Sequence, residues 1–190
     1  MPFLAKPSED LIGRFEQEAP GVRRRTVCAA EGRPTPVRSE PKDETGDSER
    51  RSVQSGLVLI VEDDALVAFQ IEDSLEEDGF TICGVAATAS AGLAMFHECR
   101  PEFAVLDVRL AEGDGRDVAR AIAALSPETT ILMCTAEDED HLHGIGAHAL
   151  LRKPFDFKSV GEALMATRCW SKGEWTVKPP PHLIRLRSGR

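Results

Sequence analysis

Five polar residues of this chain end or directly follow apolar runs, and their types suit the chemistry of phosphoryl groups. These residues are Glu62, Asp63, Asp107, Thr135 and Lys153. Carboxylates bind divalent cations, and a carboxylate beside such a cation can attack phosphorus because the cation screens the repulsion between two anions. A lysine ammonium and a threonine hydroxyl can then hold the phosphoryl oxygens. The set therefore suits metal-assisted phosphoryl transfer, provided that the fold brings its members together.

The apolar runs before these residues have the composition of buried parallel strands. Residues 57–61 read Leu-Val-Leu-Ile-Val, and a run that is apolar throughout indicates a strand covered on both faces. Between the runs, apolar residues recur at helical spacing, as Leu66, Ile71 and Leu75 do. We predict strands at 57–61, 80–86, 103–106, 130–135 and 148–152, and helices at 65–78, 88–99, 114–125, 137–144 and 156–169.

This alternation of strands and helices predicts an α/β fold. Five βα units in 113 residues indicate a doubly wound, five-stranded parallel sheet with the flavodoxin-like strand order 2-1-3-4-5. In that order the first and third strands are neighbours, so Asp107 should lie beside Glu62 and Asp63. Close carboxylates repel by about 4 kcal/mol per pair at 4 Å and an effective dielectric constant of 20. We therefore expect a cation among them, and an all-oxygen site with several waters suits Mg²⁺ better than zinc.

The flanking segments differ from this central part in composition. Residues 1–54 are rich in Pro, Arg, Glu and Ser with sparse apolar residues, so we predict a mostly disordered leader. Residues 55–169 form the predicted domain, and the basic, proline-containing residues 170–190 are predicted to be a solvated tail. Residues 56–168 carry 8 basic and 21 acidic side chains, a net charge of −13, which disfavours direct binding to DNA.

The cysteines and the hydropathy of the chain indicate a cytoplasmic protein. The five cysteines are odd in number and lack C-x-x-C spacing, as expected of free thiols in a reducing compartment. The amino terminus lacks the basic-then-apolar plan of a secretory signal. No apolar run approaches the ~18 residues needed to cross a bilayer. We therefore expect a soluble protein without a membrane partner.

Taken together, these motifs give the segment from Leu57 to about Arg168 a resemblance to the CheY-like receiver domain of bacterial response regulators. The motifs that carry it are Val61-Glu62-Asp63-Asp64, Val105-Leu106-Asp107, Gly115, Thr135-Ala136 and Lys153-Pro154-Phe155, in family order. The resemblance implies that Asp107 is the phosphoacceptor. It also implies a Mg²⁺ site made of Glu62, Asp63, Asp107 and the backbone carbonyl of Arg109. The phosphoryl group would be held by Thr135, Ala136 and Lys153, with a cis Lys153–Pro154 bond.

Two positions depart from the family pattern. Receivers usually carry an aromatic residue three positions before the lysine, which swings inward when the threonine engages the phosphoryl group, whereas this chain has Leu150. A proline is common four residues after the acceptor, whereas this chain has Ala111. The chemistry of the site is therefore expected to be intact, whereas the atypical switch position Leu150 does not fit the family's usual activation mechanism.

The resemblance implies a single-domain response regulator of a two-component phosphorelay. A sensor histidine kinase or histidine phosphotransfer protein would donate the phosphoryl group. An unknown downstream protein would bind the face formed by the fourth helix, fifth strand and fifth helix. Such a protein is a binding module rather than an enzyme, although it assists its own phosphorylation and dephosphorylation.

Three alternatives stay open at this point. Leu150 also fits a phosphate sink or a phosphorylation-independent adaptor. An aspartyl-phosphate hydrolase is less well supported, because such enzymes commonly place an acid two residues after the nucleophile, where this chain has Arg109.

Asp64 suits a helix cap rather than a ligand. A zinc site is not expected at His141, His143 and His148, because no cysteine or acid completes a tetrahedral set.

Overall fold

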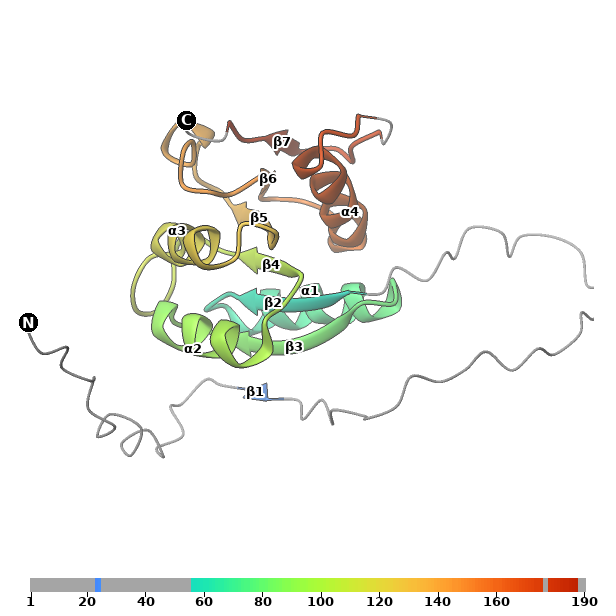
Figure 1. Cartoon of the computed structure of the whole chain (residues 1–190). Helices are drawn as coiled ribbons and strands as arrows, with labels where there is room; N and C mark the ends of the chain where they lie inside the picture. Colours follow the sequence, from blue (N-terminus) through green and yellow to red (C-terminus); the bar gives the residue numbers. More distant parts are fainter. Residues whose placement is uncertain (1–22, 25–55, 176–177, 188–190) are drawn as a thin grey trace, which may run out of the picture.

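A single seven-stranded sheet organises the chain, whose computed structural model describes residues 23–24, 56–175 and 178–187 (Figure 1). The strand order is β1-β3-β2-β4-β5-β6-β7. The five central strands are parallel: β2 (Leu57–Val61), β3 (Thr81–Ala86), β4 (Phe103–Leu106), β5 (Thr130–Thr135) and β6 (Ala149–Arg152). They confirm the predicted order 2-1-3-4-5. Two short antiparallel strands, β1 (Arg23–Arg24) and β7 (Leu183–Arg185), pair with its two sides.

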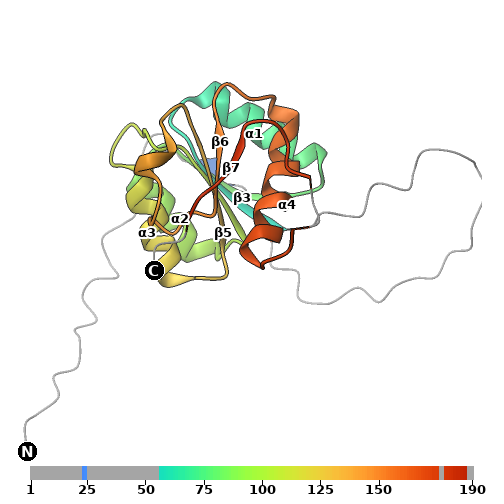
Figure 2. The ribbon, with the colours of Figure 1, turned by 90° about the horizontal axis from the view of Figure 1, so that it is seen from above.

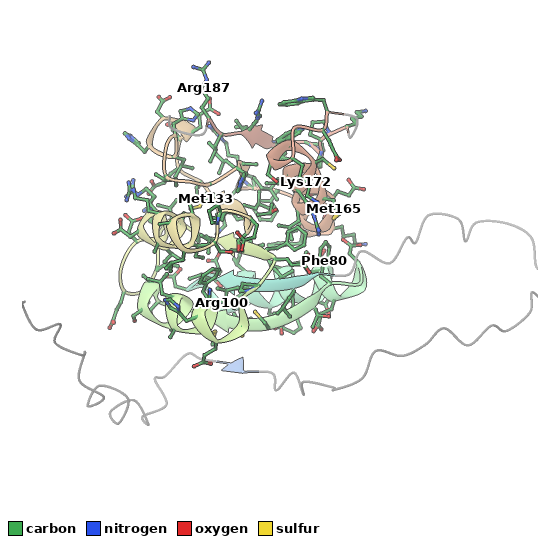
Figure 3. The ribbon with its side chains drawn as sticks, in the orientation of Figure 1. Phe80, Arg100, Met133, Met165, Lys172 and Arg187 are labelled. Carbon is green, nitrogen blue, oxygen red and sulfur yellow. The ribbon has the colours of Figure 1, made fainter. Side chains whose placement is uncertain are left out.

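Four α-helices within the described residues cover both faces of the sheet, as expected for a doubly wound fold (Figure 2). One face carries α1 (Ala65–Glu77) and α4 (Val160–Ser171), and the other carries α2 (Ala89–Cys99) and α3 (Gly115–Leu125). Each face has its own cluster of buried apolar side chains, and these fill the layers between sheet and helices (Figure 3). Two 3-10 helices, η2 (Glu139–His141) and η3 (Phe157–Ser159), complete the described elements.

Three helices begin directly after a residue whose side chain caps the first turn. The Asp64 carboxylate accepts hydrogen bonds from the amides of Leu66 and Val67, at 2.9 and 3.2 Å. Thr88 caps α2 and Asp114 caps α3 in the same way. Such caps satisfy amides that have no partner inside the helix. Asp64 is therefore a cap, as predicted, which leaves Glu62 and Asp63 as the acids available at the end of β2.

The prediction of a helix at residues 137–144 is wrong. Between β5 and β6, where every residue is described, the only helical element is the single turn η2. Gly144 and Gly146, at and beyond the end of this segment, turn the chain with positive φ angles of 75° and 88°. Within residues 137–144, Leu142 is the only buried side chain, so the segment lacks an apolar stripe. A helix here would have no face to bury.

The prediction of a solvated tail is wrong for residues 183–187. Strand β7 pairs with β6, with Leu150 opposite Ile184 and Leu151 opposite Leu183, and the Leu186 side chain is only 2 % exposed. In the predicted leader, only residues 23–24 are described. The expectation of disorder for the rest of residues 1–54 lies outside the described residues. Among those that are described, no helix is long and apolar enough to cross a bilayer.

Truncating Leu186 tests the unexpected strand. Leu186→Ala should lower the free energy of unfolding by about 2 kcal/mol, because it removes buried methyl groups and leaves a cavity. Leu125→Ala is the matched control, since Leu125 is 50 % exposed, and it should change stability by less than about 0.5 kcal/mol. Denaturant titration measures both variants. Equal, small effects would show that residue 186 is solvated.

Candidate functional site

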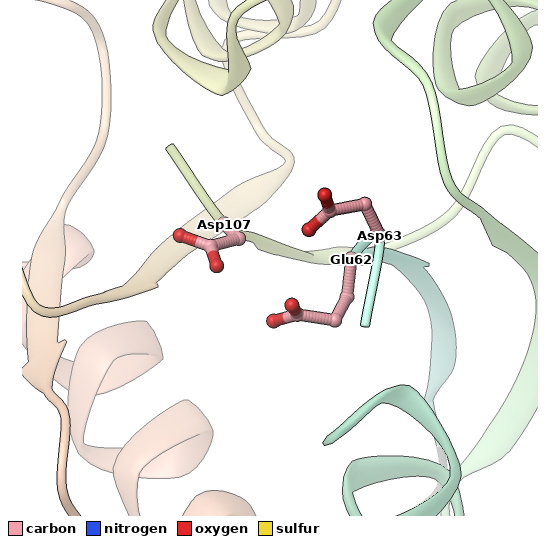
Figure 4. A group of neighbouring side chains, drawn as sticks. All are labelled: Glu62, Asp63 and Asp107. Atoms are coloured by element: carbon pink, nitrogen blue, oxygen red, sulfur yellow. The ribbon is translucent and has the colours of Figure 1, made fainter. Parts of the chain in front are cut away.

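The predicted acidic cluster forms at the carboxyl ends of β2 and β4. These strands are parallel neighbours with Val61 opposite Leu106, and the amide of Asp107 donates to the Val61 carbonyl at 2.8 Å. The register therefore places the acids that follow each strand side by side. One carboxylate oxygen from each of Glu62, Asp63 and Asp107 lies within 4.8 Å of the others (Figure 4). Within the described residues this is the only such cluster of potential metal ligands.

Lys153 enters the same cluster from the end of β6. Its ammonium Nζ donates to Asp107 Oδ2 at 2.7 Å and to Glu62 Oε2 at 2.8 Å. The backbone amide of Lys153 donates to the Thr135 carbonyl at 3.0 Å, so the lysine is anchored beside the end of β5. The Lys153–Pro154 peptide bond is cis, as expected. Side chains from three strand ends thus meet, and Thr135 reaches the same edge at the end of β5.

The Asp107 carboxylate is buried and its rotation is fixed by backbone donors. Oδ1 accepts from the amide of Val108 at 2.6 Å and, at 3.4 Å, from that of Arg109. Behind it, Gly115 donates its amide to the Val108 carbonyl at 2.9 Å. A Cβ on Gly115 would lie 1.7 Å from the carbonyl oxygen of Asp107. Glycine is therefore required for this close approach of two backbones.

Burial and charge act against each other in this cluster. Burial of Glu62, reinforced by the Asp107 charge, raises the pKa of the Glu62 carboxyl to about 7, although the hydrogen bond from Lys153 works in the opposite direction. For Lys153, burial favours the neutral amine, but the hydrogen bonds to Asp107 and Glu62 outweigh it and raise the pKa of the ammonium. Lys153 therefore stays charged and offsets only part of the acidic repulsion.

The residues present fit a small divalent cation. With all groups ionised, three carboxylates and one ammonium carry a net charge of −2, which a divalent ion balances. Mg²⁺ binds oxygen ligands at about 2.1 Å in an octahedron and usually keeps several waters. Such a shell requires carboxylate oxygens about as close together as those of the cluster. Asp63 is exposed, so water can complete the shell.

The structure places the other predicted site residues as follows. Thr135 is buried, and its hydroxyl accepts from the amide of Glu137 at 3.3 Å. Ala136 is exposed, which leaves space next to Thr135. Leu150 is fully buried in the core. The Arg109 carbonyl as a metal ligand stays a prediction, and the Arg109 side chain, 79 % exposed, binds Glu137 at 3.3 Å.

Sequence reasoning missed this ion pair and its neighbours. Glu137 also lies 3.7 Å from Arg116, which binds the helix-capping Asp114 at 2.6 Å. The pairs connect the loop after Asp107 with the loop after Thr135. Arg116 and Asp114 are two residues apart in the chain, whereas the two pairs with Glu137 have no sequence signal, because the pairing of β4 with β5 brings their members together. The Nδ1 atoms of His143 and His148 accept the backbone amides of Arg187 and Ile131.

Known proteins that resemble this chain share the same domain. A family model, the response regulator receiver domain, matches residues 58–165. The photosynthetic apparatus regulatory protein RegA of Rhodobacter capsulatus is 33 % identical over 128 residues, which cover 65 % of this chain and 66 % of RegA. The chemotaxis protein CheY of Thermotoga maritima is 27 % identical over 111 residues, which cover 56 % of this chain and 92 % of that protein.

Solved structures agree with the sequence comparisons. The chemotaxis response regulator CheY4 of Vibrio cholerae superposes with a TM-score of 0.55 at 25 % identity, covering 60 % of this chain and 99 % of that one. The matched segment therefore spans nearly all of both chemotaxis proteins but about two thirds of RegA.

The raised pKa of Glu62 predicts how stability depends on pH in the absence of metal. Because the folded-state pKa of about 7 exceeds the usual 4.5, the folded protein holds the proton more tightly than the unfolded chain. This contribution is present below pH 4.5 and is lost as the pH rises through 7. In EDTA, Glu62→Gln should remove a fall in stability on the order of 2 kcal/mol between pH 5 and 7.5. Thermal melts of both proteins at each pH measure it, and parallel curves would contradict it.

The crowding of carboxylates predicts opposite effects of one substitution with and without Mg²⁺. Asp63→Asn should raise the melting temperature in EDTA by about 3 °C, because it removes ~1 kcal/mol of repulsion at this exposed position. It should also abolish most of the stabilisation that millimolar Mg²⁺ gives the unmodified protein. Asp64→Asn is the matched control, since asparagine also caps helices, and it should keep the Mg²⁺ effect. An equal Mg²⁺ effect in all three proteins would argue against this site.

Proposed function

The chain belongs to the response regulator receiver family, and from this premise we propose that Asp107 accepts a phosphoryl group from a phosphohistidine. The observation that carries the proposal is the position of the Lys153 ammonium, within 2.8 Å of both Asp107 and Glu62 beside an exposed third acid. A buried carboxylate with a cation-binding cluster on one side and a fixed ammonium on the other has both elements that an anionic nucleophile needs to approach an anionic phosphoryl group.

The two oxygens of Asp107 have different roles in this proposal. Oδ1 is held by backbone amides, whereas Oδ2 faces Lys153 alone among the described side chains. We assign Oδ2 as the nucleophile: it forms the new bond to phosphorus while the bond from phosphorus to the histidine nitrogen breaks. Bound Mg²⁺ would neutralise charge on the carboxylates and the phosphoryl oxygens. Lys153 then moves from Asp107 to a phosphoryl oxygen, and the Thr135 hydroxyl donates to another.

The donor in this proposal is a sensor histidine kinase or histidine phosphotransfer protein in the cytoplasm, and the acceptor signals by binding a downstream protein. The acidic domain, with its net charge of −13 over residues 56–168, supports a protein target rather than DNA. The reaction is a single transfer to the protein itself, so the chain acts as a phosphoacceptor that assists its own modification rather than as an enzyme with a separate substrate.

A phosphate sink or phosphorylation-independent adaptor is the second candidate, and the position of Leu150 favours it. Leu150 is fully buried opposite Ile184, so there is no aromatic side chain at this position to move. If the protein is a sink, phosphorylation should change backbone amide NMR shifts only within the acidic cluster. Shift changes that extend to β6 and β7 would exclude the sink.

Phosphotransfer can be tested with a small donor that has the same bond as phosphohistidine. Radiolabelled phosphoramidate and Mg²⁺ should label the full chain with at most one phosphoryl group. Hydroxylamine should remove this label, because a phosphorylated aspartate is an acyl phosphate. Asp107→Asn should lower labelling at least ~100-fold, because the amide is not a nucleophile. Asp117→Asn, on the exposed side of α3, is the matched control and should label normally.

Two outcomes would overturn the assignment. Equal labelling of Asp107→Asn and the unmodified protein would exclude Asp107 as the acceptor. Absence of labelling of the unmodified protein, with both a small donor and a phosphorylated kinase, would exclude phosphoacceptance altogether.

A further inference from the structure

Residues 182–187, here called the strap, pair with the outer side of β6, the strand that ends next to the acidic cluster. Three residue pairs join β7 to β6. Two hydrogen bonds extend this pairing: the Arg152 amide donates to the His182 carbonyl at 3.1 Å, and the Leu186 amide donates to the His148 carbonyl at 3.0 Å. The strap is thus bonded along the whole length of β6 (Figure 1).

The strap also contributes to the core on both faces of the sheet. Leu186 is buried, and it belongs with Ile184 to the cluster under α2 and α3. Leu183 belongs to the cluster under α1 and α4. In addition, the Arg185 guanidinium stacks 4.2 Å over the ring of Trp175, which follows α4. The strap is therefore packed, but it is short and holds one fully buried side chain, so its opening costs much less than unfolding of the domain.

Each end of the strap is fastened to a segment that leaves the acidic cluster. At one end, His182 is bonded to Arg152, the residue directly before Lys153. At the other end, the Arg187 amide donates to His143 Nδ1 at 3.2 Å, and the Gly144 amide donates to the Arg187 carbonyl at 3.2 Å. His143 and Gly144 lie in the segment that begins at Thr135. Thr135 therefore begins one of the segments that hold the strap, and Lys153 directly follows the other.

The sequence offers no other evident route for a signal through β6. Leu150 is fully buried directly opposite Ile184 of the strap, so a side-chain movement there would have to displace the strap first. The segment between β5 and β6 has only the turn η2 in place of a helix, and the strap is bonded to its end. The strap is thus bonded to β6 and to the end of the segment that joins Thr135 to β6.

We propose that occupancy of the acidic cluster by a phosphoryl group loosens the strap and frees the edge of β6. This inference rests on the proposed phosphoacceptor function. In this proposal Lys153 transfers an ammonium hydrogen bond from Glu62 or Asp107 to a phosphoryl oxygen, and the Thr135 hydroxyl, which accepts from the amide of Glu137, donates to the same group. Lys153 and Thr135 adjoin the backbone segments to which the strap is fastened, so a backbone shift at either residue acts on the strap. The freed edge of β6, with Leu150, is the kind of unpaired strand to which an extended peptide segment can add.

Hydrogen exchange of the full chain tests this coupling. Beryllofluoride with Mg²⁺ serves as the phosphoryl mimic on Asp107, and ¹⁹F NMR reports whether it binds. The amides of Leu186 and Arg187, which donate to His148 and His143, should exchange at least ~10-fold faster in the occupied state. The Ser126 amide, bonded to Ile122 at the end of α3, should not change. In Asp107→Asn the effect should disappear.

The outcomes separate this inference from the proposed function. If beryllofluoride binds and the strap amides exchange at the same rate or more slowly, the coupling is wrong while phosphoacceptance stands. If neither beryllofluoride nor phosphoramidate reacts with Asp107, both fall together.

Thermodynamic reciprocity supplies a second test. If occupancy loosens the strap, a loosened strap must strengthen binding of the mimic by the same factor. Arg187→Pro removes the amide that donates to His143 at the exposed end of the strap, so the domain should stay folded, and it should bind Mg²⁺–beryllofluoride at least ~3-fold more tightly. Leu186→Ser should increase the affinity for the mimic more strongly, whereas Leu125→Ser, at an exposed position of α3, should leave the affinity unchanged. Unchanged affinity in folded Arg187→Pro would overturn the coupling.

Discussion

The mutual repulsion of three carboxylates at the ends of β2 and β4 is the constraint on which the rest of this structure depends. Parallel pairing of the two strands makes the crowding unavoidable, since Glu62 and Asp107 each follow a strand directly. The ammonium of Lys153 offsets part of the repulsion from the end of β6, and burial raises the pKa of Glu62. The three acids and Lys153 therefore carry an unbalanced negative charge, which fits a divalent cation.

The same constraint connects the site with the edge of the sheet. The amide of Lys153 is bonded to the carbonyl of Thr135, and the amide of Arg152 directly before it is bonded to the carbonyl of His182. Any change in the partners of Lys153 acts on a strand that is bonded on both sides. In this chain the strap, rather than solvent, lies on one side of β6, and Leu150 is fully buried opposite Ile184 of the strap. Leu150, at the position where receivers usually carry an aromatic residue, is therefore directly paired with the strap.

Much of this could be predicted from the sequence, because the five parallel strands are continuous apolar runs and Asp64, Thr88 and Asp114 mark helix starts. The residues of the cluster follow from that strand order. The helix predicted at 137–144 is absent because this acidic segment has no apolar stripe to bury against the sheet. Strand β7 escaped detection because three residues among prolines and arginines have no periodicity, and only long-range pairing with β6 defines them.

A crystal structure with Mg²⁺ and beryllofluoride tests the central claim most directly. The account predicts beryllium on an oxygen of Asp107, a metal ion about 2.1 Å from at least two of the three carboxylates, and the Lys153 ammonium on a fluorine atom. An empty acidic cluster under saturating conditions, or Lys153 still bound to both Glu62 and Asp107 beside a bound ligand, would contradict it.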